Sequence, residues 1–506
     1  MRKAMIIFAV LLVLTIGGMS YAHASLTASQ YDVSFTEVAS YGDVSAADGL
    51  TVSVQTQLAQ HLLWDSTYTF GQEPNTQTNF DFSSKQRNWQ GEYIANALSL
   101  GILSDFSISA YGGDLLNDSK RDSIFRNEWD SALSQDITSM SAFFYDVASR
   151  TKNGEQHSET INIRDYYEYY SINVNFFEYQ MSPNYFIRYD GEGRQYISQQ
   201  ADYIETREIF SNYFKIPVPE NHRVTVDIHK DSVGNVVQIS LTQESPVWLR
   251  AVSVDTKSGI YFALEKEGLT DLRDINGNFG IYLLPASTIL DYDGVELPTL
   301  DYHNLSAVYP LDESVHVQRL DLSEDESCLN LLTIEDDVLF LTVIELATMS
   351  EKQKLPLFDN IGEQRWQNVI YRDGLFFLLL DDTRFVLAQM SSNNIYQIVL
   401  SDARDYELLN EDAFANGYYR WYEPVISWDG KRLAIVTAAQ PFFTHIDNGY
   451  AVGHIYDICG FEVEIFDEGG LKHKGVYKNS LDVMATMTDY DGRCRLIDSG
   501  GLSPSW

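Results

Sequence analysis

The feature that most constrains this chain is a short apolar run that repeatedly follows an acidic bend. Runs of five to eight residues bounded by turn residues indicate buried strands rather than helices. An Asp-Gly pair makes a tight turn between two strands because glycine readily adopts positive φ. The three clearest bends and the runs that follow them are 335–337 with 338–345, 373–374 with 375–380, and 429–430 with 433–437.

The spacing of these bends indicates a repeated unit built from strands. Asp337 and Gly374 lie 37 residues apart, and Gly374 and Gly430 lie 56 apart, which requires an insertion in the second interval. A period near 40 residues made of strands is typical of a propeller blade. The predicted fold class is therefore mainly β, with a β-propeller-like body.

One of these bends carries a longer motif. Residues 423–434 run Glu-Pro-Val-Ile-Ser-Trp-Asp-Gly-Lys-Arg-Leu-Ala. This stretch resembles the blade motif of periplasmic Tol-type and related WD-like β-propellers, in which a proline stands where this chain has Trp428. The resemblance implies a propeller scaffold and a binding role, and it assigns no catalytic residue.

Other segments complete the predicted organisation. Residues 25–48 have weak patterning and are predicted to be an exposed leader, followed by one β domain over 49–506. Within that domain, apolar residues recur every three or four positions from Glu128 to Ser149, which predicts a helix. We therefore expect a helical insertion near 91–150. The runs 224–229 and 236–241 flank a polar turn and predict a β-hairpin.

The first 24 residues are typical of a secretory signal. Arg2 and Lys3 precede an uncharged apolar run over 4–19, and Ala22 and Ala24 form an A-x-A cleavage pattern. The alternative is an uncleaved anchor, but a spanning helix needs about 20 apolar residues. We therefore expect an extracytoplasmic protein, secreted or at the cell surface. Contact with a membrane is expected only through this segment, if it is retained.

The charge excludes one large class of partner. The net charge is −37, and removal of Arg2 and Lys3 with the signal leaves −39. Nucleic-acid binding depends on Lys and Arg neutralising phosphates, so no nucleic-acid partner is expected. The acidic residues are scattered along the chain rather than grouped in one tail. Solubility explains this acidity, and the alternative is binding of a cation or a cationic polymer.

The cysteines and the Asp/Asn-rich turns are candidates for cross-linking or metal binding. Of the three cysteines, Cys459 and Cys494 are the candidate disulfide, and free buried thiols are the alternative. No cofactor is expected except calcium, for which Asp274, Asn276 and Asn278 are the candidate oxygen ligands. An ordinary β-turn explains the same three residues.

Familiar catalytic motifs are absent from the sequence. It contains no G-x-S-x-G elbow, no P-loop and no H-E-x-x-H pair. With 72 acidic residues, no carboxylate pair for glycoside hydrolysis can be selected. No catalytic residue is therefore predicted, and the sequence favours a non-enzymatic protein over an enzyme.

An aromatic block suggests where a ligand binds. Tyr166, Tyr169, Tyr170 and Tyr179 could line a sugar-binding groove, although aromatic residues in strands also form cores. We predict a non-enzymatic binding or sensing module for an unknown protein or glycan. The alternatives are an extracellular carbohydrate-active enzyme using an acidic pair and a structural surface interaction protein.

Overall fold

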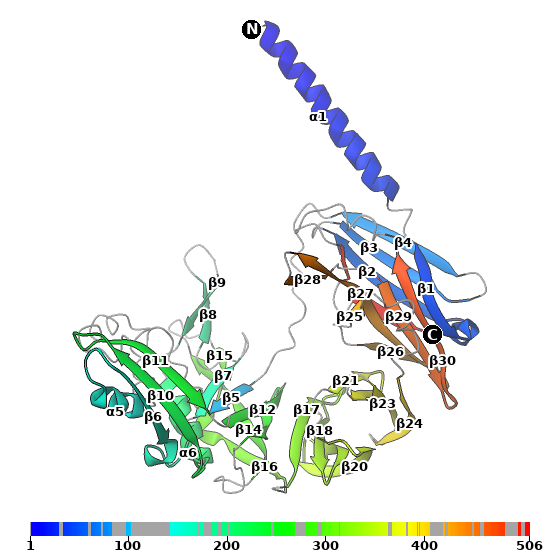
Figure 1. Cartoon of the computed structure of the whole chain (residues 1–506). Helices are drawn as coiled ribbons and strands as arrows, with labels where there is room; N and C mark the ends of the chain where they lie inside the picture. The colour runs from blue at the N-terminus through cyan, green and yellow to red at the C-terminus, as the bar shows by residue number, and fades with distance from the viewer. Residues whose placement is uncertain are drawn as a thin grey trace. The chain divides into compact units, whose positions relative to one another are not determined.

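The fold is known from a computed structural model. It describes residues 2–29, 34–58, 62–71, 74–82, 98–102, 142–170, 172–176, 185–189, 195–199, 203–243, 247–268, 279–290, 296–312, 314–362, 367–380, 383–391, 393, 395–404, 418–419, 424–447, 450–455, 460–480, 494–496 and 501–506. These residues divide into two compact units, one made of 1–93 with 365–506 and the other of 94–364. Each unit is built from small antiparallel sheets (Figure 1).

The predicted signal segment lies in a helix, α1, which spans Arg2–Ser29. The side chains from Val10 to Ser25 are exposed, and they include both alanines of the predicted cleavage site. No helix in the described part of the chain is long and apolar enough to cross a membrane.

One sheet of the first unit, here called the closing sheet, joins segments from both ends of the sequence. β2 pairs on one edge with β3 and on the other with β31 and β32, and Val54 lies opposite Leu502. Val52 and Val54 are buried and Ser53 is exposed, as expected for a strand with one face in the core. The strands are β2 (Thr51–Leu58), β3 (Leu62–Thr69), β4 (Asn75–Phe82), β31 (Cys494–Leu496) and β32 (Leu502–Ser505).

The seven-stranded sheet of the first unit also combines distant segments. β1 pairs with β30 along its length, so residues 35–42 of the predicted leader belong to a sheet, although most of their side chains are exposed. A short 3-10 helix, η1 (Val44–Ala47), then leads toward the closing sheet. The strands are β1 (Phe35–Gly42), β25 (Tyr418–Tyr419), β26 (Val425–Trp428), β27 (Leu433–Asp447), β28 (Tyr450–Ile455), β29 (Gly460–Asp467) and β30 (Gly470–Asn479).

The third sheet of this unit, the β21–β24 sheet, is a four-stranded meander. Its second strand contains the predicted apolar run, and residues 376–380 are all buried. A central strand covered on both faces has no polar alternation, which explains why this run is uniformly apolar. The strands are β21 (Gln367–Arg372), β22 (Leu375–Leu380), β23 (Arg384–Met390) and β24 (Tyr396–Ala403).

β29 shows how these three sheets pack face to face. Phe461 and Val463 belong to the core shared with the closing sheet, where the ring centroids of Phe461 and Tyr68 are 6.0 Å apart. Phe466 points to the other face, and its ring lies 4.8 Å from that of Phe385 in the β21–β24 sheet. The seven-stranded sheet is therefore covered on both sides, as a propeller blade is.

A buried ion network lies on the face of β29 and β30 that turns toward the β21–β24 sheet. Lys474 Nζ lies 3.0 Å from Glu464 Oε1 and 3.6 Å from Glu462 Oε1. Arg404, which follows β24, contacts both glutamates, with its Nε bonded to Glu464. All four side chains are at most 4% exposed, and their formal charges cancel. Removing one member would leave a buried charge unpaired, which typically costs about 3–5 kcal/mol.

A second cluster of polar side chains lies on the opposite face of β30. Tyr477 OH donates a hydrogen bond to Glu37 Oε2 at 3.1 Å and lies 3.2 Å from His473 Nε2. Gly475 lies between the two residues on the same face of the strand. A Cβ at Gly475 would be 2.8 Å from the Tyr477 ring and 2.9 Å from His473 Nε2. Because Gly475 has no side chain, Tyr477 and His473 can occupy the space above it and contact each other.

The second unit contains two larger sheets. In the β12–β16 sheet, β13 and β14 pair centrally, and Phe262 and Tyr282 lie opposite each other. Their cluster extends to Leu329 and Leu331 of the β17–β20 sheet, so these two sheets share one core. The strands are β12 (Val247–Thr256), β13 (Gly259–Gly268), β14 (Gly280–Leu290), β15 (Glu296–Leu300), β16 (Ser306–Pro310), β17 (His316–Leu322), β18 (Cys328–Glu335), β19 (Val338–Glu345) and β20 (Ser350–Asp359). A 3-10 turn, η3 (Tyr302–Asn304), connects β15 and β16.

Helices and smaller sheets complete the second unit. The hairpin predicted around 231–235 is confirmed by the pairing of β10 with β11, and β10 also pairs with β6 to complete a three-stranded sheet. Phe143 and Phe144 of one helix, and Phe210 and Phe214 of another, enter the same core as the strands. The elements are β5 (Leu98–Ile102), α5 (Ala142–Arg150), β6 (Gln156–Asn162), η2 (Ile163–Asp165), β7 (Ile172–Phe176), β8 (Tyr185–Tyr189), β9 (Gln195–Gln199), α6 (Tyr203–Phe214), β10 (Arg223–Lys230) and β11 (Val236–Gln243).

The predicted mainly β fold is confirmed, and its four-stranded antiparallel sheets are propeller-like. Of the predicted helical insertion, 142–150 is helical, 98–102 is a strand, and the remainder of 91–141 lies outside the described residues.

The three predicted bends occupy two different positions in their sheets. Those at 373–374 and 429–430 join a first strand to a second, whereas 336–337 joins the second strand β18 to the third, β19. The bend equivalent to the first two is at Asp325, between β17 and β18. The 37 residues between Asp337 and Gly374 are therefore not the length of one repeat.

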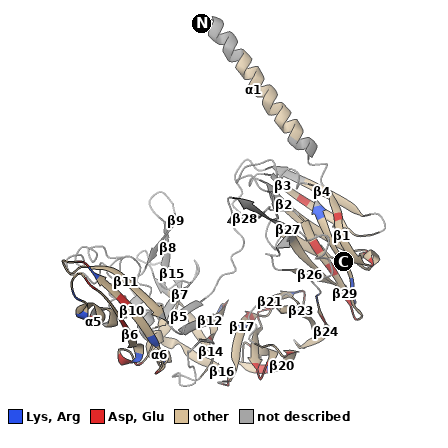
Figure 2. Ribbon diagram, in the orientation of Figure 1, with Lys and Arg blue, Asp and Glu red and all other residues tan. Residues whose placement is uncertain are grey.

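Many acidic side chains have a structural role in turns. Asp231 Oδ1 accepts hydrogen bonds from the backbone of Val233 at 2.9 Å and of Asn235 at 2.8 Å, and the side chain and backbone of Asn235 lower the pKa of Asp231. Short acidic side chains stabilise turns in this way. Figure 2 shows acidic residues in both units, in keeping with a distributed negative charge.

We predict that Gly475→Ala destabilises the protein by about 1–3 kcal/mol, because the added methyl group would collide with Tyr477 and His473. The measurement is the urea midpoint of unfolding. Gly71→Ala is the control, since a Cβ there meets no atom within 4 Å. Equal midpoints for the two variants would contradict this role of Gly475.

We also predict a loss of stability as pH falls below about 6.5, the ordinary pKa of histidine. Burial lowers the pKa of His473 and of His222, so the unfolded chain binds protons that the folded chain does not. His473→Gln should make the urea midpoint less dependent on pH between 6.5 and 5. The exposed His316→Gln should leave that dependence unchanged, and the same slope in both variants would refute the prediction.

Candidate functional site

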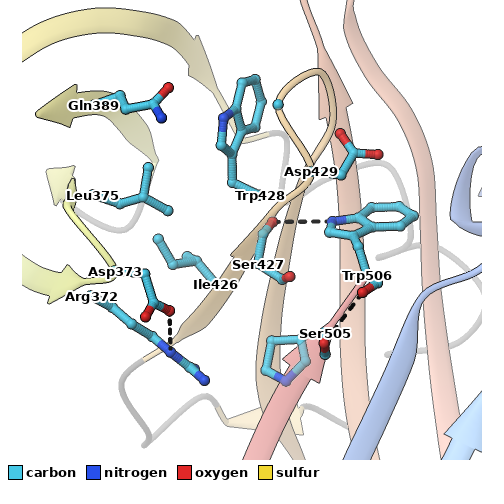
Figure 3. Close-up of a pocket in the computed structure, with 12 residues that line it drawn as sticks. Arg372, Asp373, Leu375, Gln389, Ile426, Ser427, Trp428, Asp429, Ser505 and Trp506 are labelled. Atoms are coloured by element: carbon cyan, nitrogen blue, oxygen red, sulfur yellow. Dashed lines mark hydrogen bonds and ion pairs between the residues drawn. The ribbon is translucent and has the colours of Figure 1, made fainter. Parts of the chain in front are cut away.

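A groove in the first unit lies where three segments end. It has a volume of about 540 Å³ and combines the β21–β22 turn, the β26–β27 turn and the end of β32 (Figure 3). We call it the Trp428 groove. The residues that line it are Arg372, Asp373, Leu375, Gln389, Ile426, Ser427, Trp428, Asp429, Gly430, Pro504, Ser505 and Trp506.

The β26–β27 turn is the bend with the propeller-like motif. Asp429 Oδ1 accepts hydrogen bonds from the backbone N–H groups of Lys431 at 2.8 Å and Arg432 at 2.6 Å. Gly430 has φ of +92°, a conformation that glycine adopts without strain. This rigid turn places Trp428 at the edge of the groove.

Arg432 holds this turn to two distant segments. Its Nε lies 2.8 Å from Asp429 Oδ2, and its guanidinium donates a hydrogen bond to the Ala46 carbonyl at 2.8 Å. Its Cζ lies 3.8 Å from the centroid of the Trp506 ring, in a cation–π contact. The Trp506 Nε1 in turn donates to the Ser427 carbonyl at 3.3 Å. The wall formed by Trp506 is therefore fixed by four interactions.

Trp428 has a different environment from Trp506. Its side chain packs against the core between the seven-stranded and β21–β24 sheets, as Leu375 also does, but it remains partly exposed. Its Nε1 is buried and has no hydrogen-bond partner among the described residues. In Figure 3 the Nε1 edge of the indole faces Gln389. Trp428 therefore offers a partly exposed ring to the groove, while its N–H is buried.

The β21–β22 turn supplies the charged rim. Asp373 and Gly374 have φ of +52° and +72°, as in a tight two-residue hairpin turn. Arg372 Nε lies 3.4 Å from Asp373 Oδ2, and these side chains are 47% and 81% exposed. An ion pair this exposed contributes little to stability. The pair is therefore available to meet a ligand.

The carboxylates of the groove are both accompanied by arginines. Burial would raise the pKa of Asp429, but hydrogen bonds from the backbone and side chain of Arg432 and from the backbone of Lys431 outweigh it and lower that pKa. Asp429 therefore stays ionised near neutral pH. Asp373 lies beside Arg372 and Asp429 beside Arg432, so each of these two side-chain carboxylates has an arginine next to it.

The tyrosines selected from the sequence do not share one surface. Tyr170 is a core residue, 2% exposed, whose hydroxyl lies 2.7 Å from His222 Nδ1. Tyr166 is half-buried and donates to Asp146 Oδ2 at 2.6 Å, while Tyr169 is exposed. Burial and the hydrogen bond to Asp146 raise the pKa of Tyr166 to about 12. Tyr179 lies outside the described residues.

The candidate calcium ligands Asp274, Asn276 and Asn278 also lie outside the described residues. In the described part of the chain, no group of three or more His, Cys, Asp or Glu side chains is placed to hold a metal ion. Cys459 is likewise not described, whereas Cys494 begins β31. The predicted disulfide therefore stays a prediction.

The residues missed by the sequence analysis are the two tryptophans and their polar neighbours. Trp428 did carry a signal, because it replaces the proline of the motif that residues 423–434 resemble. Trp506, Gln389 and Arg372 carried none. They reach the groove only through the pairing of β32 with β2 and through the packing of neighbouring sheets.

Comparisons with known proteins leave the family open. No family model matches the chain, and no curated protein matches it. The Tol-type resemblance therefore stays a prediction.

Several solved structures share features with it at low similarity. A Bacteroides uniformis protein, provisionally described as a 6-phosphogluconolactonase, is 12% identical, covering 59% of this chain and 91% of that one, with a TM-score of 0.23. The periplasmic gluconolactonase of Pseudomonas aeruginosa is 12% identical over 62% and 94%, with a TM-score of 0.20. The Swd1 β-propeller domain of Myceliophteria thermophila is 8% identical over 51% and 93%, also at 0.20. These TM-scores are too low to transfer any activity, and the fold rests on the strand pairing described above.

We predict that Arg432→Met destabilises the protein by about 1–3 kcal/mol, because it removes an ion pair, a hydrogen bond to Ala46 and the contact with Trp506. Arg372→Met is the matched control, and we expect it to cost less than about 1 kcal/mol, since its ion pair is exposed. Urea unfolding of both variants measures the difference. If Arg372→Met costs as much as Arg432→Met, Arg432 does not hold these segments together.

Proposed function

We propose that this chain is an exported binding module whose ligand occupies the Trp428 groove. The observation that carries the proposal is the partly exposed indole of Trp428, with a buried and unpartnered N–H, in a groove of about 540 Å³. Binding sites combine an apolar surface with a few fixed polar groups in this way. The signal-like N-terminus supports export, and the net charge of −37 supports a ligand other than nucleic acid.

Binding fits the electrostatics of the groove better than catalysis. Glycoside hydrolysis needs one carboxyl group that stays protonated until it donates to the leaving group. Asp429 is a poor candidate because its pKa is lowered. Asp373 is paired with Arg372 and is 81% exposed, whereas a general acid is usually kept protonated by burial. We therefore favour a non-enzymatic role for these groups.

The test is a ligand screen of the purified chain followed by tryptophan fluorescence and thermal shift. The panel contains monosaccharides, oligosaccharides, amino acids, short peptides and nucleotides. We expect at least one class to bind saturably, and Trp428→Ala to weaken that binding about tenfold or more. Tyr169→Ala, which truncates an exposed tyrosine of the other unit, should leave binding unchanged.

Two results would overturn the proposal. Loss of binding in Tyr169→Ala with normal binding in Trp428→Ala would place the ligand on the aromatic block. Mass spectrometry of the bound ligand after long incubation should return it unaltered. A converted ligand whose conversion requires Asp373 or Asp429 would establish an enzyme instead.

A further inference from the structure

We infer that the ligand of the Trp428 groove is a neutral saccharide. The inference rests on the proposed binding function and adds the chemical class of the ligand. It follows from three properties of the groove: its ring face, its charge balance and the geometry of its polar groups.

The ring face available to a ligand is that of Trp428. Arg432 already lies over the Trp506 ring at 3.8 Å, so that face is occupied by a cation of the protein itself. Trp428 has no such partner among the described residues, and its side chain packs against the buried core between the seven-stranded and β21–β24 sheets. A sugar ring presents C–H groups on one side, and these pack favourably on an immobile indole.

The charge balance disfavours ionic ligands. An anion would be attracted to Arg372 but repelled by Asp373, whose carboxylate lies 3.4 Å from it, and by the negative charge of the whole chain. A cation would be drawn by that overall charge, but Asp373 and Asp429 each already have an arginine beside them. A neutral ligand is not repelled by Asp373 and does not have to compete with the arginines for the carboxylates.

The polar groups match hydroxyl groups. Arg372, Asp373 and Gln389 are exposed, planar and placed on one side of Trp428 (Figure 3). Together they offer donors and acceptors to neighbouring hydroxyls. Leu375 and Ile426 also line the groove. A volume of about 540 Å³ suits a short oligosaccharide.

The experiment is isothermal titration of the purified full-length chain with defined probes. Neutral probes are cellotriose, maltotriose, xylotriose and chitotriose; charged probes are trigalacturonate and trilysine. We expect at least one neutral trisaccharide to bind, with affinity changing less than about twofold between 50 and 500 mM NaCl, since no ion pair is formed. Trilysine or trigalacturonate binding would instead weaken steeply with salt.

Variants assign the binding to the named residues. Trp428→Ala should weaken the neutral ligand about tenfold or more, and Trp428→Phe should restore part of the affinity by keeping a ring face. Asp373→Asn should also weaken binding. Asp336→Asn is its matched control, because Asp336 has a similar φ of +48° in a turn of the other unit.

The outcomes separate the two proposals. Binding of only a charged probe, with loss in Trp428→Ala, overturns the saccharide inference and leaves the proposed function standing. Binding of a neutral trisaccharide that Trp428→Ala does not change overturns both the inference and the choice of groove. If none of the four neutral probes binds, the saccharide inference is wrong, and the broader screen then decides the proposed function.

Discussion

The constraint on which this structure depends is that the central strands β22 and β29 must be covered on both faces. β29 buries Phe461 and Val463 on one side and Phe466 on the other, and β22 is apolar at every position from 376 to 380. A sheet whose central strand is apolar on both faces would expose that apolar surface to water if it stood alone. Packing sheet against sheet supplies the missing burial, and it leaves the strand ends and turns as the surface that is free to vary.

The Trp428 groove is formed by such strand ends and turns. The turns that line it are held by their own hydrogen bonds, as Asp429 shows, so their outward side chains do not have to build the core. Trp428 belongs to both regions, because one part packs on the core and the other part lines the groove. This position explains how the proposed binding surface can be rigid without being buried.

The closing sheet links the stability of the first unit to the site. β32 brings Pro504, Ser505 and Trp506 to the groove only while it pairs with β2. Arg432 strengthens that arrangement by bonding both to the N-terminal segment at Ala46 and to the Trp506 ring. A ligand that contacts this wall would therefore also stabilise the pairing of the two ends, as expected for any ligand that binds only the folded form.

The sequence alone determined the properties that depend on neighbouring residues. Period-two patterns, apolar runs and Asp-Gly bends predicted a mainly β chain and the β10–β11 hairpin, because strand burial and turn geometry are local. Only the tertiary structure decided which segments meet. The pairing of β2 with β32 spans almost the whole sequence, and Tyr170 enters the core because His222 lies next to it in space. Long-range contacts leave no trace in local periodicity, so the groove could not be found from the residues that form it.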